Sequence, residues 1–99
     1  MLNITKAVEN GKAIFNLEGR LDTVTAPQLD QSFRESLDGL KELTLDCEKL
    51  EYVSSAGLRV LLSAQKTMNK QGEMKLLHVC ETIMEIFEVT GFKDILTIL

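Results

Sequence analysis

The sequence has few of the residues from which metal and redox sites are built. It holds one histidine, His78, and two cysteines, Cys47 and Cys80, which stand far apart and form no CxxC pair. Zinc sites and disulfide frameworks need more of these residues at closer spacing. We therefore expect no metal, no redox centre and no cofactor, and we interpret the cysteines as small buried hydrophobes.

Basic clusters and long apolar runs are also missing. The net charge is -4, and the 11 lysines and arginines are scattered along the chain. No basic face is offered to nucleic acid or to anionic lipid. The apolar stretches fall short of the roughly 20 residues of a membrane span, and the first residues lack the apolar core of a signal peptide. We expect no nucleic acid partner, no membrane partner and a cytoplasmic location.

The residues that are present indicate one compact domain. A chain of 99 residues with 44% hydrophobic content can bury one modest core. Apolar residues alternate on both sides of Asn10-Gly11, a dipeptide typical of tight hairpins, so two antiparallel strands are predicted to open the fold. Thr25-Ala26-Pro27-Gln28 then has the pattern of a capping box and predicts a helix, which Gly39 is placed to end.

Strands and helices alternate in the rest of the chain. The pattern predicts a short strand at Leu43 to Asp46, a loop at Cys47 to Tyr52, a helix near Ala56 to Gln71, a strand at Met74 to Val79 apolar enough to be central, a helix around Ile83, Ile86 and Phe87, and a last strand at Ile95 to Leu99. The order β-β-α-β-α-β-α-β predicts an α/β fold, with a mixed, mostly parallel sheet and covering helices.

Ser54 and Ser55 stand where the longest predicted helix begins. A hydroxyl in this position meets free backbone N–H groups and the positive end of the helix dipole, so it can cap the helix or carry a phosphate. A nucleophilic serine is a third interpretation, but Val53 leaves Gly-x-Ser-x-Gly incomplete and His78 is the sole histidine base. No glycine-rich phosphate loop is present, and we expect no enzyme activity.

Several short motifs together resemble a known family. They are Gly19-Arg20-Leu21-Asp22, Leu43-Thr44-Leu45-Asp46, Leu50-Glu51-Tyr52-Val53, Ser55-Ala56-Gly57-Leu58 and Val89-Thr90-Gly91-Phe92. In this order and spacing, residues 1–99 resemble a single STAS domain, and among the STAS domains the stand-alone bacterial anti-sigma factor antagonists.

The resemblance implies a phosphorylation-switched binding protein. Members of that group bind an anti-sigma factor with serine kinase activity, which frees a sigma factor for transcription; the kinase then phosphorylates one serine, and a serine phosphatase reverses the step. Aligning Gly57-Leu58 with the family pattern places Ser55 at the modified position and leaves Ser54 as the helix cap, where the family has aspartate. The expected partner-binding residues are Asp22, Ser54, Ser55, Ala56, Gly57, Leu58 and Arg59.

Two alternatives stay open at this point. The chain could be a constitutive STAS docking subunit of a transport or lipid-trafficking assembly, which the loss of the family's aspartate at Ser54 favours. Asp22 could bond to backbone N–H groups in the turn before the first helix instead of facing a partner.

Overall fold

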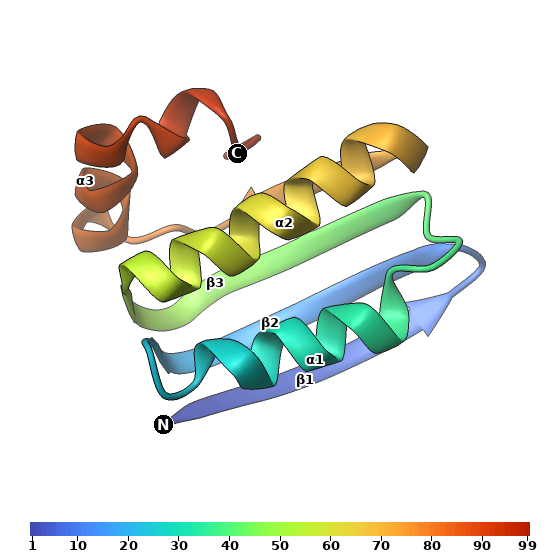
Figure 1. The fold of residues 1–99 in the computed structure, drawn as a ribbon, viewed down its shortest axis with the longest axis horizontal. Coiled ribbons are helices and arrows are strands. Elements are labelled where there is room, and N and C mark those ends of the chain that lie inside the picture. Colours follow the sequence, from blue (N-terminus) through green and yellow to red (C-terminus); the bar gives the residue numbers. More distant parts are fainter.

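The computed structural model describes all residues from Met1 to Leu99. Its elements follow the predicted order up to the carboxyl end (Figure 1). They are β1 (Leu2–Glu9), β2 (Lys12–Leu21), α1 (Ala26–Ser36), β3 (Glu42–Val53), α2 (Ser55–Gln71), β4 (Glu73–Leu77), α3 (Glu81–Thr90) and a 3₁₀ turn (Phe92–Asp94).

The four strands form one mixed sheet in the order β1-β2-β3-β4. The β1–β2 pair is antiparallel, and the β2–β3 and β3–β4 pairs are parallel. Asn10 and Gly11 both have positive φ, at 52° and 77°, as a two-residue hairpin with the right-handed twist of its strands requires. The predicted hairpin and the mostly parallel sheet are confirmed.

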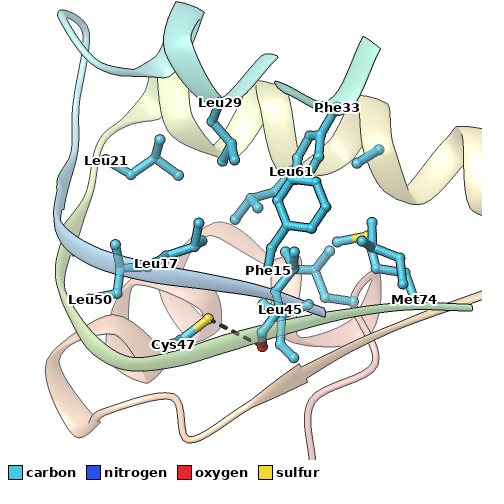
Figure 2. Close-up of a cluster of buried hydrophobic side chains, with 14 of the residues drawn as sticks. Phe15, Leu17, Leu21, Leu29, Phe33, Leu45, Cys47, Leu50, Leu61 and Met74 are labelled. Carbon is cyan, nitrogen blue, oxygen red and sulfur yellow. Dashed lines mark hydrogen bonds between the residues drawn. The ribbon is translucent and has the colours of Figure 1, made fainter. Parts of the chain in front are cut away.

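The core lies on the side of the sheet that α1 and α2 cover (Figure 1). Along β2 the side chains of Ala13, Phe15 and Leu17 are buried and the residues between them are exposed, so the opposite face of this strand is open to solvent. Figure 2 shows Phe15 reaching from β2 toward Phe33 of α1, with ring centroids 5.2 Å apart, and Leu61 of α2 beside them.

The loop predicted for Cys47 to Tyr52 is wrong, because β3 runs unbroken to Val53. Its pairing with β2 shifts register twice, so Asn16 faces Asp46, Glu18 faces Lys49 and Arg20 faces Tyr52. Each shift adds a residue to β3 in the manner of a β-bulge. The bulges interrupt the alternation of buried and exposed residues along β3. Without that alternation, the sequence of this part of β3 does not indicate a strand.

The carboxyl end also departs from prediction. Residues Ile95 to Leu99 do not form a strand: they meet the sheet through one bridge between Ile98 and Leu76. The strand predicted as central, β4, is an edge strand that ends at Leu77. The Leu76 N–H donates to Thr97 O at 2.9 Å and the Leu99 N–H to Leu76 O at 3.0 Å, so the last residues cover part of this edge.

Candidate functional site

Two strand-to-helix junctions meet at one end of the sheet. The turn after β2 leads into α1, Ser54 joins β3 to α2, and the two helices begin side by side (Figure 1). The Ser54 N–H donates to Leu21 O at 2.8 Å, which ties the start of α2 to the end of β2. Residues distant in sequence are thereby held in one surface.

The two serines of this junction have different roles. Ser54 has extended backbone angles and its Oγ accepts from the Gly57 N–H at 3.2 Å, so it is the N-cap of α2. Ser55 is the first helical residue, it is exposed, and its hydroxyl makes no hydrogen bond. The prediction that Ser54 caps the helix is confirmed, and the helix begins one residue earlier than predicted.

Asp22 organises the turn that faces this junction. Its Oδ1 accepts from the N–H groups of Val24 and Thr25, each at 3.0 Å, and these bonds, with Thr25 first, hold the pKa of the carboxyl below its usual value. The predicted capping box does not form: Thr25 Oγ1 donates to Arg20 O at 2.7 Å instead of capping α1. The local role considered for Asp22 is therefore present in the structure.

An arginine and a tyrosine stack where the second bulge lies. Arg20 and Tyr52 face each other across β2 and β3, and the guanidinium carbon lies 4.4 Å from the centre of the ring. Arg20 Nε is also 3.9 Å from Asp22 Oδ2. A cation over an aromatic face and beside a carboxylate is held in place, so this side chain is already engaged within the protein.

The remaining predicted partner-binding residues differ in their access to solvent. Arg59 is exposed and Ala56 is half-buried, whereas Gly57 and Leu58 are buried, so these two support the site from inside. A shallow groove between the first turns of α1 and α2 adjoins them. Its lining residues include Thr23, Ala26, Pro27, Ala56, Arg59 and Val60.

Val24 is a surface feature that the sequence interpretation missed. This apolar side chain is 85% exposed at the tip of the Asp22 turn, beside the groove that Thr23 lines. In the sequence, Val24 is a single apolar residue among polar turn residues. It fits neither the alternation of the strand before it nor the periodicity of the helix after it. Burial of this side chain against a partner would remove its apolar surface from water.

Asp46 and His78 form a second polar pair, away from the serine junction. His78 Nδ1 lies 3.1 Å from Asp46 Oδ1, and His78 makes no hydrogen bond with Ser55. The hydrogen bond that the imidazole donates to the Asp46 carboxylate raises the pKa of His78, and the same bond lowers the pKa of Asp46. His78 has φ 58°, a left-handed conformation that histidine and asparagine adopt more readily than most residues.

The His78–Asp46 pair makes stability depend on pH. Because the pKa of His78 is raised, its contribution is complete below its unfolded pKa near pH 6.5 and is lost as pH rises through the folded value; Asp46 loses its contribution as pH falls through its lowered pKa. We expect His78→Asn to flatten the decline in melting temperature between about pH 6 and pH 8. If the melting temperatures of both proteins changed with pH in the same way over that range, this assignment would be contradicted.

Both cysteines belong to the hydrophobic interior, Cys47 within the core and Cys80 packed against it. Burial, and then the charge of Asp46, raise the pKa of Cys47 to about 12, and Cys80 is half-buried at the start of α3. No three acidic, histidine or cysteine side chains gather as metal ligands. None of the helices is long and apolar enough to span a bilayer.

The fold and the junction together define a small α/β domain that presents one free hydroxyl at a helix start. The family model of the STAS domain matches residues 3–99, and the chain belongs to that family. The family assignment made from the motifs is confirmed.

Curated relatives share nearly the whole chain. The BtrV protein of Bordetella bronchiseptica, assigned as an anti-sigma factor antagonist, is 34% identical over 95% of this chain and 83% of its own length. The anti-sigma-B factor antagonist of Staphylococcus aureus is 29% identical over 96% of this chain and 90% of its own length.

Solved structures share the fold at lower sequence identity. An anti-sigma factor antagonist from Mycobacterium paratuberculosis matches with a TM-score of 0.87 at 20% identity, covering 99% of this chain and 85% of its own. Bacillus SpoIIAA in its unphosphorylated form matches with a TM-score of 0.75 at 17% identity, covering 100% of this chain and 87% of its own. In its phosphorylated form SpoIIAA matches with a TM-score of 0.74 at 17% identity, covering 100% and 91%.

Proposed function

We propose that this protein is a cytoplasmic anti-sigma factor antagonist whose binding to its partner is switched by phosphorylation of Ser55. The unphosphorylated form binds an anti-sigma factor that is also a serine kinase, and a serine phosphatase restores that form. The observation that carries the proposal is the division of roles at the junction. Ser54 supplies the cap, so the exposed Ser55 hydroxyl is free to accept a phosphate.

The fold is suited to accept that phosphate. The added charge of about -1.5 to -2 lies at the positive end of the α2 dipole, which favours anions by about 0.3–1 kcal/mol. The backbone N–H groups of Ser55 and Ala56 have no hydrogen-bond partner in the protein. The likeness of the chain to both forms of SpoIIAA supports the view that one fold serves both states.

The switch then acts on the partner surface and not on the fold. A phosphate facing a closely packed partner is desolvated, and without a counter-charge there its cost exceeds the gain from the helix dipole. The accessible parts of this surface are Ser55, Arg59 and the half-buried Asp22, Ser54 and Ala56. Gly57 and Leu58 fix its shape from beneath.

This proposal is tested by comparing the two forms of the protein directly. Amide spectra of the unmodified and the Ser55-phosphorylated protein are expected to differ only near the junction, while calorimetry shows binding of the anti-sigma kinase from the same genome to the unmodified form alone. Equal affinity of the kinase for both forms would refute the switch.

Val24 provides a separate test of the partner surface. Val24 is exposed at the tip of the Asp22 turn, beside the groove that Thr23 lines, and burying its side chain against a partner would stabilise the complex, so we expect Val24→Ser to weaken binding about 5- to 30-fold while leaving the melting temperature unchanged. Val89→Ser is the matched control, because Val89 is 87% exposed on α3. Equal effects of the two substitutions would remove Val24 from the interface.

A further inference from the structure

Arg59 lies one helical turn after Ser55 on the same side of α2. The two residues are four positions apart in α2, both exposed, and positions i and i+4 of a helix carry neighbouring side chains. Helical side chains lean toward the amino end, so Arg59 covers the turn that contains Ser55. An anion placed four residues before a cation is also the favourable order along a helix.

Arg59 is the one arginine of the three in the chain that has no carboxylate partner. Asp30 lines the same groove as Arg59, but its Oδ2 accepts from Arg34 Nε at 2.9 Å and it forms no ion pair with Arg59. Arg20 is engaged by Asp22 and by the Tyr52 ring. A new anion at the start of α2 therefore meets a guanidinium with no competing bond to break.

We infer that Arg59 captures the phosphate on Ser55 and that this capture is part of the switch. The inference rests on the proposed function, because it needs Ser55 to be the residue modified. In the phosphorylated protein the guanidinium and the N–H groups of Ser55 and Ala56 bind the phosphate oxygens together. A planar guanidinium binds such oxygens through paired, charge-assisted hydrogen bonds.

Binding of the phosphate by Arg59 changes the partner-binding surface in two ways. In the unmodified protein Arg59 supplies positive charge to the groove between α1 and α2, where a partner carboxylate can pair with it. Phosphorylation adds about -1.5 to -2 charges and also removes Arg59 from that groove. An acidic partner segment thereby gains a repelling group and loses its counter-charge in one step. This explains how a phosphate that the fold accepts can abolish binding.

Phosphorus NMR of the phosphoprotein tests the capture without any partner or kinase. Phosphoserine is incorporated at position 55 by codon reassignment in the otherwise unchanged protein, in Arg59→Gln and in Lys66→Gln, and the second ionisation of the phosphate is followed by its chemical shift. Lys66 is an exposed cation of the same helix, so its removal changes the net charge equally. At about 1.5 Å of rise per residue it lies beyond reach of Ser55.

The second phosphate pKa in the unsubstituted phosphoprotein and in Lys66→Gln is expected to lie about half a unit below that in Arg59→Gln, and Arg59→Lys is expected to restore part of the difference. The same pKa in Arg59→Gln and Lys66→Gln overturns the capture, as does unfolding of the phosphoprotein. If phosphorylation abolishes kinase binding equally with and without Arg59, the proposed function stands, but Arg59 has no part in the switch and the inference fails even where the pKa difference is present. If phosphorylation leaves kinase binding unchanged, the proposed function fails, and a pKa difference then shows only that Arg59 binds the phosphate.

Discussion

Replacing Ser55 by glutamate is expected to weaken binding to the anti-sigma kinase by at least about 100-fold, because a carboxylate that is desolvated in a packed interface, facing a surface that binds the neutral form, costs a few kcal/mol. Ser55→Ala keeps the surface neutral and small, so its affinity should stay within about threefold of the original while it can no longer be switched off. Titration of each variant with the kinase measures both effects.

Two further variants separate this effect from general changes in the helix. Thr82→Glu places the same charge in the exposed first turn of α3 and should bind normally. Ser54→Ala removes the cap of α2 and should cost about 1 kcal/mol of unfolding free energy. A constitutive docking subunit makes a different prediction, since no phosphate acts on it and neither phosphorylation nor its reversal should alter its binding in the cell.

Gly57→Ala is expected to destabilise the protein by about 1–3 kcal/mol, although alanine is favoured over glycine by about 1 kcal/mol inside a helix. A Cβ atom at this position would lie 2.7 Å from Leu21 Cγ and 2.9 Å from Leu21 O. The Leu21 carbonyl also accepts the Ser54 N–H, so it cannot retreat without breaking the bond that joins the two junctions. Urea unfolding gives the change in free energy.

The control for this prediction is Ser63→Ala, an exposed position in the same helix that gains alanine's propensity without the contact. Because the clash displaces the first turn of α2, Gly57→Ala should also weaken kinase binding. A Gly57→Ala protein at least as stable as the original would show that the start of α2 is not held against Leu21.

The hairpin and the two helices that flank the groove could be predicted because their signals are local. Asn10-Gly11 specifies its turn by its own backbone preferences, and the apolar stripes of α1 and α2 repeat with the helical period. The serine pair could be found for the same reason, since a helix start is visible in a short stretch of sequence. The assignment of Ser55 to phosphorylation came from the family motif and stays a prediction.

Features that depend on distant residues could not be predicted. The bulges of β3 follow from its register with β2, and the contact between Gly57 and Leu21 joins residues far apart in sequence. Gln71 Nε2 donates to Leu37 O at 2.6 Å and to Leu40 O at 2.8 Å, which satisfies carbonyls just after α1 from the end of α2. Tertiary placement alone creates these contacts, and the exposure of Val24 has the same origin.

The most direct test of the central claim is phosphopeptide mapping of the protein isolated from its own cells. The peptide that spans the start of α2 carries both serines, and fragmentation spectra distinguish a phosphate on one from a phosphate on the other. We predict phosphate on Ser55 with Ser54 unmodified, since the Ser54 hydroxyl is engaged as the cap. Phosphate on Ser54 alone, or an unmodified peptide under every growth condition, would contradict the account.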